Sequence, residues 1–139
     1  MIIKQLSIFL ENEPGSLYKI TSLIAAKNIN LRALCVAETA NFGILRFITA
    51  SPEEAKALLE DAGLSVQIRD VLCVKISDSP GGLSKPLGVL ANEGIDVKYL
   101  YAFVSTEEAN TAYAVMRVDD IQCAAEVLTR NGHTGIGMK

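Results

Sequence analysis

The feature that most constrains the fold of this chain is an internal duplication. Residues 6–17 align with residues 72–83 at a constant offset of 66, and each segment holds a Pro-Gly pair followed two residues later by leucine. The same offset aligns residues 27–31 with residues 93–97, after which the copies drift apart by a few residues. Such a repeat predicts two copies of one small supersecondary unit. The expected domains are residues 1–69 and 70–139.

Apolar residues in each copy switch between a spacing of two, typical of a strand, and a spacing of about 3.6, typical of a helix. Leu6, Ile8 and Leu10 alternate with Ser7 and Glu11, which predicts a strand that buries one face. A helix with one apolar stripe follows each Pro-Gly pair. The other predicted strands are residues 31–37, 44–49 and 64–68 in the first copy and 72–76, 97–104, 113–118 and 134–138 in the second.

The order of elements in each copy is therefore strand, helix, strand, strand, helix, strand. It predicts an α+β protein of two tandem ferredoxin-like βαββαβ domains, with antiparallel sheets and helices on one face. A domain of this size buries only about 60% of its unfolded surface and is marginal alone. Because strand 31–37 carries apolar residues on both faces, we expect the sister copy, or a second chain in a homodimer, to cover the free face.

The second helix of each copy has its own start signal. Ser51, Pro52 and Glu54 predict a capping box with proline at the first helical position, and Gly63 predicts where that helix ends. In the second copy Asp120 is the predicted N-cap.

Composition argues against several classes of function. The formal net charge is −3. Lys and Arg are not concentrated in one stretch as a nucleic-acid-binding face would require, so we do not expect binding to nucleic acid. No run of about 18 apolar residues occurs, so we expect no membrane span and a cytoplasmic location. Cys35, Cys73 and Cys123 form no CxxC pair. We interpret them as small buried hydrophobic residues, and we expect no metal and no cofactor.

The sequence shows no catalytic constellation. The single histidine, His133, follows the predicted helix stop at Gly132, and no serine lies in a GxSxG sequence. Asp119 and Asp120 precede a helix, where a cap and a dipole partner are the simpler interpretation. We therefore predict that the protein is not an enzyme. A small ferredoxin-like enzyme that works through Asp or Glu is a further alternative.

The loops before the first helix of each copy are candidate ligand sites. Pro14-Gly15 and Pro80-Gly81 place backbone-exposing residues at a helix start, where unpaired N–H groups and the positive dipole end suit a carboxylate. Asn12 or Asp78 would accept hydrogen bonds from an ammonium group. The alternative, that Asn12 and Asp78 only organise the turn, stays open on the sequence.

Energetics require more than a loop. A helix start contributes at most ~2 kcal/mol to holding a carboxylate, whereas millimolar binding requires about 4 kcal/mol. The ligand must also fill an apolar pocket, which we expect where Leu17 or Leu83 meets second-strand side chains. Candidates for that lining in the second copy, or else core residues, are Tyr99, Tyr101 and Phe103.

Both loops and their surroundings resemble the ACT family, whose mark is an Asn- or Asp-x-Pro-Gly-x-Leu loop after the first strand and a Gly-Ile-Asn-Ile-like start of the second. Residues 12–17 with Asn28-Ile29-Asn30-Leu31 fit this pattern, and so do residues 78–83 with Gly94-Ile95-Asp96-Val97. The resemblance covers essentially the whole chain, in two copies.

The resemblance implies a non-catalytic regulatory protein that binds an amino acid or a similar small ligand at an interface between domains and controls a partner enzyme or regulator of amino-acid metabolism. A ligand-free ACT subunit that docks a partner enzyme is the alternative. The implied ligand contacts are Asn12, Pro14, Gly15, Leu17 and Asn30 in the first copy and Asp78, Pro80, Gly81, Gly82, Leu83 and Asp96 in the second.

The two copies differ within this pattern. Gly82 stands where the first copy has Ser16, and Asp96 stands where it has Asn30. Pro86 removes a backbone donor early in the second copy's first helix. The two loops therefore need not bind the same ligand, and one of them is open to a purely structural role.

Overall fold

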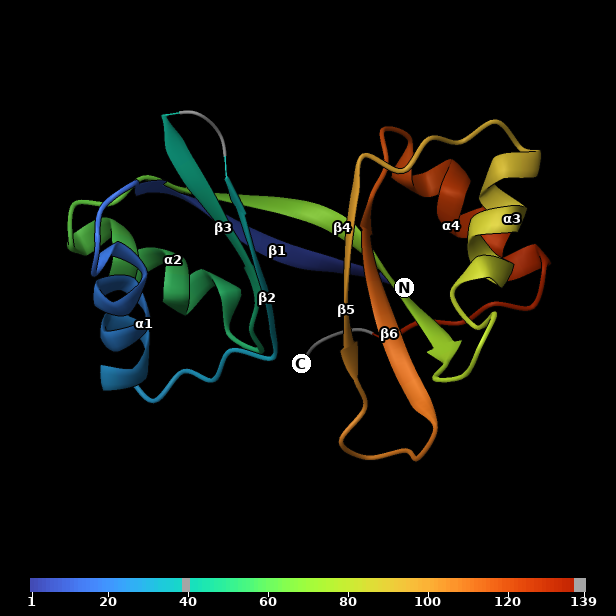
Figure 1. Ribbon diagram of the computed structural model, residues 1–139, viewed down its shortest axis with the longest axis horizontal. Coiled ribbons are helices and arrows are strands. Elements are labelled where there is room, and N and C mark those ends of the chain that lie inside the picture. The colour runs from blue at the N-terminus through green and yellow to red at the C-terminus, as the bar shows by residue number, and fades with distance from the viewer. Residues whose placement is uncertain (39–40, 137–139) are drawn as a thin grey trace. The chain divides into compact units, whose positions relative to one another are not determined.

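The computed structural model describes residues 1–38 and 41–136 and divides the chain into two compact units (Figure 1). Of the described residues, the first unit holds those within 4–69, and the second holds 1–3 and 70–136. Six strands and four helices lie in the described residues.

The first unit is a sheet covered by two helices. Its elements are β1 (Ile2–Glu11), α1 (Ser16–Ala26), β2 (Ala33–Glu38), β3 (Phe42–Ile48), α2 (Pro52–Asp61) and the start of β4 (Val66–Ser77). The strands lie in the order β2-β3-β1-β4. The β1–β3 and β2–β3 pairs are antiparallel, with Leu6 opposite Phe47 and Val36 opposite Leu45.

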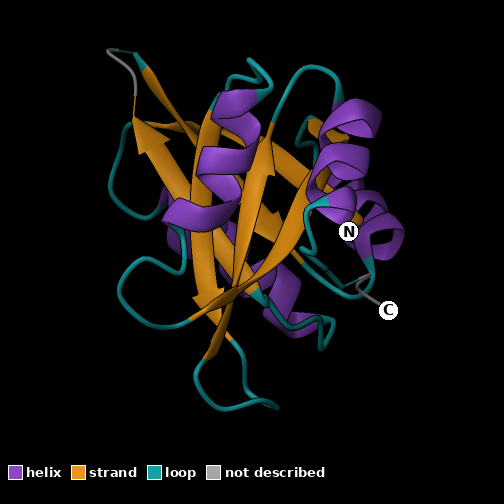
Figure 2. Cartoon of the chain, turned by 90° about the vertical axis from the view of Figure 1, so that its right-hand side faces the viewer, coloured by secondary structure: helices purple, strands orange, loops and turns teal. Residues whose placement is uncertain are grey.

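The second unit repeats this plan. After the main part of β4 come α3 (Ser84–Asn92), β5 (Tyr99–Val104), β6 (Thr111–Arg117) and α4 (Ile121–Arg130). The strands lie in the order β4-β6-β5, and both pairs are antiparallel. The helices and strands, which Figure 2 distinguishes by colour, follow one another in the predicted order up to α4. The predicted fold class is confirmed.

In the second unit, the side of β4 that does not pair with β6 is partly covered by residues near the beginning and the end of the described chain. The Cys73 N–H donates to the Met1 carbonyl at 2.7 Å, and the Lys75 N–H donates to the Thr134 carbonyl at 2.8 Å. Gly135 forms an isolated antiparallel bridge with Val74. Residues 1–3 therefore belong to the second unit, which the sequence repeat does not indicate.

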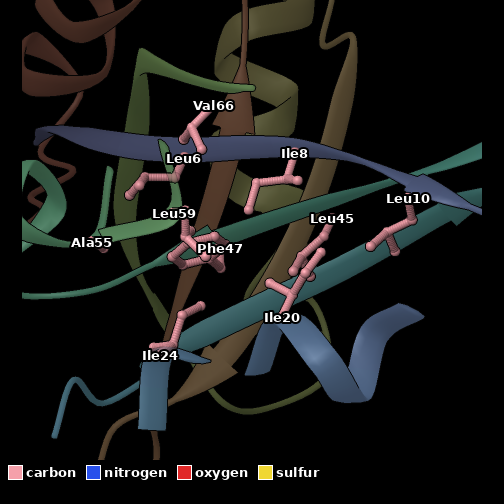
Figure 3. Close-up of a cluster of buried hydrophobic side chains, with 10 residues drawn as sticks. All are labelled: Leu6, Ile8, Leu10, Ile20, Ile24, Leu45, Phe47, Ala55, Leu59 and Val66. Carbon is pink, nitrogen blue, oxygen red and sulfur yellow. The ribbon is translucent and has the colours of Figure 1, made fainter. Parts of the chain in front are cut away.

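The core of each unit lies between its sheet and its helices. In the first unit, side chains of β1 and β3 point toward α1 and α2, where Ile20 and Ile24 complete the cluster (Figure 3). The second core repeats the pattern, with Leu72 and Val74 of β4 against Leu90 of α3 and Leu128 of α4. The strand alternation that predicted a buried face is thus the alternation that forms the core.

Three predicted strands differ from the structure. Residues 64–68 and 72–76 were expected to be separate strands, but β4 runs without a break from Val66 to Ser77. No glycine or proline lies between Ile68 and Leu72, so nothing in the backbone interrupts the extended chain. The strand predicted over residues 134–138 is reduced to the bridge at Gly135 within the described residues, and 137–138 lie outside them.

Both predicted N-cap positions are confirmed, but only one of the two side chains makes a capping hydrogen bond. Asp120 precedes α4 and its Oδ1 accepts a hydrogen bond from the Cys123 N–H at 3.1 Å. Ser51 precedes α2, with Pro52 at the first helical position as expected, but the Ser51 side chain makes no capping hydrogen bond. Instead the Ser51 N–H donates to Thr49 Oγ1 at 3.4 Å. The predicted capping box is therefore not formed.

The outer strand β2 keeps apolar side chains in solvent. Leu34 and Val36 are 47% and 46% exposed, because they lie on the face of β2 opposite the buried Ala33. Among the described residues, no helix is long and apolar enough to cross a membrane.

The two caps give a matched test. Asp120→Ala removes the acceptor of the Cys123 N–H and should lower the free energy of unfolding by about 1 kcal/mol. Ser51→Ala removes no capping bond and should change it by less than about 0.5 kcal/mol. Urea denaturation followed by circular dichroism measures both. Equal losses in the two variants would contradict the assigned caps.

Candidate functional site

The first Pro-Gly loop turns the chain sharply from β1 into α1. Gly15 precedes α1 with a φ of 91°, a left-handed conformation that a residue with a Cβ rarely adopts. The Lys19 N–H donates to the Gly15 carbonyl at 2.9 Å, which starts the helix. The Ser16 N–H reaches the Glu13 carbonyl at only 3.4 Å. The sequence Pro-Gly therefore fixes where the helix starts, directly beyond the end of β1.

A cavity of about 350 Å³ opens beside this loop. It is formed where the end of β1, the loop, the first turns of α1 and Leu64, three residues after the end of α2, meet. Its lining residues are Phe9, Leu10, Glu11, Glu13, Pro14, Gly15, Ser16, Lys19, Ile20 and Leu64. Ligand pockets in proteins usually measure about 300–1,000 Å³, so this one suits a small metabolite.

The cavity has an apolar side and a charged side. Leu10 and Ile20 are buried core residues, whereas Glu11, Glu13 and Lys19 are exposed. The described residues show no ion pair for these three charged side chains. An apolar surface beside charges of both signs is the chemistry that an amino-acid zwitterion requires: a cation for its carboxylate and a carboxylate for its ammonium group.

A second hollow of about 520 Å³ adjoins the same strand end and is lined by Asn12, Asn41, Phe42 and the last residues of β1. The rings of Phe9 and Phe42 meet edge to face here, with centroids 5.1 Å apart. Asn12, the predicted polar anchor, lines this hollow and not the cavity beside Gly15.

The second Pro-Gly loop is packed more tightly. Gly81 has a φ of 84° and so repeats the turn at Gly15. Gly82 is buried directly against the Ser77 carbonyl, so that a Cβ at this position would clash with that oxygen. The Gly82 N–H donates to the Ser79 carbonyl at 3.0 Å. The replacement of Ser16 by Gly82 thus has a steric cause within the loop.

The hairpin between β5 and β6 also holds this second loop. The Asp78 N–H donates to the Asn110 carbonyl at 2.9 Å. Lys75 Nζ forms an ion pair of 2.7 Å with Glu108, and the hydrogen bond with Glu108 raises the pKa of Lys75. Ser105 Oγ accepts from the N–H groups of the two glutamates in the same hairpin loop.

Helix α3 starts later than α1 by two aligned residues. With the offset of 66, α1 begins at Ser16 and α3 at Ser84 rather than at Gly82. Pro86 explains the delay, because proline is tolerated in the first turn of a helix but blocks a hydrogen bond further in. A helix that began at Gly82 would place Pro86 in its second turn. The Lys85 N–H still donates to the Gly81 carbonyl, but at 3.3 Å rather than the 2.9 Å of the Lys19–Gly15 bond, so the second Pro-Gly pair holds its helix start more loosely.

Asp96, the predicted contact at the start of the second strand, is held by a neighbour. Lys98 Nζ lies 3.1 Å from Asp96 Oδ2 and 3.6 Å from Asp119 Oδ2. The hydrogen bond that Lys98 donates to Asp96, followed by the charge of Asp119, raises the pKa of Lys98. Its counterpart in the first copy, Asn30, is exposed.

The structure therefore brings together only part of the predicted site. Pro14 and Gly15 line the cavity, whereas Leu17 is 37% exposed and is not among the lining residues, and neither is Asn30. Sequence reasoning missed Lys19 and Leu64. Lys19 lies four residues after Gly15, about one helical turn further on. This spacing in the sequence already indicates that its side chain lies on the same face of the helix as the loop.

Two further sets of residues lie outside this cavity. Phe103 stacks on Tyr113 with ring centroids 5.4 Å apart, and Tyr101 is buried, so these aromatic residues serve packing in the second unit. Burial raises the pKa of the Cys73 thiol to about 11. Cys123 is exposed, contrary to its interpretation as a buried residue. The described residues hold no cluster of three His, Cys, Asp or Glu that suits a metal ion.

The fold and the two Pro-Gly loops define a pair of ACT domains. The chain belongs to the ACT domain pair family, whose model matches residues 1–136. It is similar to the solved structure of protein BT0572 from Bacteroides thetaiotaomicron, with 42% identity and a TM-score of 0.90 over 98% of this chain and 92% of that one. The predicted family resemblance is confirmed.

Two more distant structures share the fold. The ligand-free regulatory subunit of aspartate kinase from Thermus thermophilus is 16% identical, with a TM-score of 0.67 over 93% of this chain and 92% of that one. The regulatory subunit of aspartate kinase from Thermus flavus is 15% identical, with a TM-score of 0.62 over 91% and 90%. No curated protein matches the chain.

The tight packing of the second loop can be tested by a single methyl group. Gly82→Ala places a Cβ against the Ser77 carbonyl and should lower the free energy of unfolding by more than about 2 kcal/mol. Gly88→Ala, within α3 where a Cβ meets no atom within 4 Å, should raise it by about 0.5–1 kcal/mol. Chemical denaturation of both variants measures the difference. A harmless Gly82→Ala would contradict the close contact.

Proposed function

We propose that this protein is a non-catalytic regulator that binds an amino acid or a similar small ligand and thereby controls a partner enzyme or regulator. The observation that carries the proposal is the cavity beside Gly15, in a chain of the ACT domain pair family. Its apolar lining supplies the burial that a helix start alone lacks.

The charged side of the cavity suits the ends of an amino acid. In this proposal Lys19, which lines the cavity, pairs with the carboxylate, and Glu11 and Glu13 accept hydrogen bonds from the ammonium group. Charge-assisted hydrogen bonds are about twice as strong as neutral ones. In this proposal they orient the ligand, and apolar contact supplies most of the remaining affinity.

Regulation would act through assembly. A ligand shifts an equilibrium only when it binds one state better than the other, and a second chain that closes the open side of the cavity would provide such a state. We propose a homodimer, and the exposed Leu34 and Val36 of β2 support a second chain that packs on this face of the sheet. The cytoplasm is the expected location, since free amino acids and the enzymes that use them meet there.

The regulatory subunits of aspartate kinase that share the fold support an enzyme of amino-acid metabolism as the partner. The second candidate is a ligand-free subunit that only docks such an enzyme. The same exposed side chains of β2 favour this second candidate, because an exposed apolar surface can bind a partner without any ligand.

A thermal-shift titration with each of the twenty amino acids separates these candidates. A ligand at 100 times its dissociation constant adds ~2.7 kcal/mol of stability, which should raise the melting temperature by on the order of 5–10 °C. Ser16→Trp, which fills the cavity, should abolish the rise. Ser84→Trp, at the first residue of α3, should preserve it. If no amino acid raises the melting temperature, the ligand-free subunit is the better account.

A further inference from the structure

We propose that the cavity of the first unit alone holds the ligand, and that this ligand is an amino acid with an apolar side chain. The second Pro-Gly loop is then a closed structural copy. This inference rests on the proposed function and narrows it in two respects: the number of sites in each chain and the class of side chain that they accept.

The number of sites follows from the packing of the second loop. Ser16 is partly exposed and lines the first cavity, whereas its counterpart Gly82 is buried against the Ser77 carbonyl. The Asp78 N–H is already bonded to the Asn110 carbonyl. A ligand at the second loop would have to displace this contact and separate Gly82 from the carbonyl that it touches.

In the second copy, Asp96, the predicted ligand contact at the start of the second strand, already has an ion-pair partner. Asp96 is paired with Lys98, which is shared with Asp119. A ligand ammonium group at the second loop would have to compete with Lys98 for the Asp96 carboxylate. The second copy therefore satisfies internally the groups that its sequence pattern offers to a ligand.

The class of side chain follows from the depth of each lining residue. Leu10 and Ile20 are 6% and 4% exposed, and Leu64 is partly buried against the same core. The lining charges, on Glu11, Glu13 and Lys19, belong to exposed side chains, and in this proposal they hold the backbone ends of the amino acid. A charged ligand side chain would reach the apolar end unpaired, which costs free energy.

The two copies also differ at this apolar end. The Leu64 N–H donates to the Leu59 carbonyl at 3.0 Å, and the His133 N–H donates to the Leu128 carbonyl at 3.0 Å, each just after a helix. Leu64 and His133 are therefore structural counterparts. The second copy has an imidazole where the first has the apolar side chain that lines the cavity.

Isothermal titration calorimetry tests both parts with L-leucine and L-phenylalanine as probes, and with L-aspartate, L-lysine and L-leucinol as comparisons. The expected stoichiometry is one probe per chain. L-Aspartate and L-lysine should bind at least about tenfold more weakly, and so should L-leucinol, which lacks the carboxylate. Lys19→Ala and Leu64→His should each weaken L-leucine about tenfold or more.

Lys85→Ala is the matched control for Lys19→Ala, since the two lysines align in the repeat and Lys85 lies on α3. It should change L-leucine affinity less than about twofold. Unchanged melting temperatures without ligand establish that the variants fold. Two probes per chain, or equal losses in the two lysine variants, overturn the single site while the proposed function stands.

Tighter binding of L-aspartate or L-lysine than of L-leucine overturns the apolar class and leaves the proposed function intact. If none of the twenty amino acids binds, the proposed function fails and this inference fails with it. The three results are distinct, so the calorimetric series separates an error in the site from an error in the function.

Discussion

The structure depends on one turn, in which a left-handed glycine follows proline between the first strand and the first helix of each copy. Gly15 and Gly81 both have a positive φ, and an added Cβ at either would meet no neighbouring atom. Their conformation, not crowding, is therefore what requires glycine. The turn folds each helix back over its sheet, which buries the alternate residues of the strand. It also places the helix start beside the strand end, where the cavity of the first unit forms.

Most of the fold could be predicted because its signals are local. The alternation at Leu6, Ile8 and Leu10 and the Pro-Gly pairs specify strands and turns through neighbouring residues, and the repeat shows them twice. The failures have non-local causes. The residues around Ser51 in the sequence do not indicate that its hydroxyl makes no capping hydrogen bond to α2. The place of residues 1–3 depends on a hydrogen bond between Cys73 and Met1, which lie far apart along the chain.

The candidate site shows the same division. The sequence identified Pro14 and Gly15, which belong to a short pattern, but not Leu64, which joins the cavity only through the packing of α2 against the sheet. The sequence shows that Gly82 replaces Ser16 but not why. In the structure, a Cβ at position 82 would clash with the Ser77 carbonyl oxygen. Duplication explains how this arises: when two copies share one chain, one can keep an open loop while the other is selected for packing.

The most direct test of the account is a methyl NMR spectrum of the protein with and without the amino acid that binds most tightly. The account predicts that chemical-shift changes concentrate on the methyl groups of Leu10, Ile20 and Leu64, which line the cavity. Leu83 and Leu87, which pack in the second unit, should keep their shifts. Changes centred on these two leucines, or no change for any amino acid at saturating concentration, would contradict it.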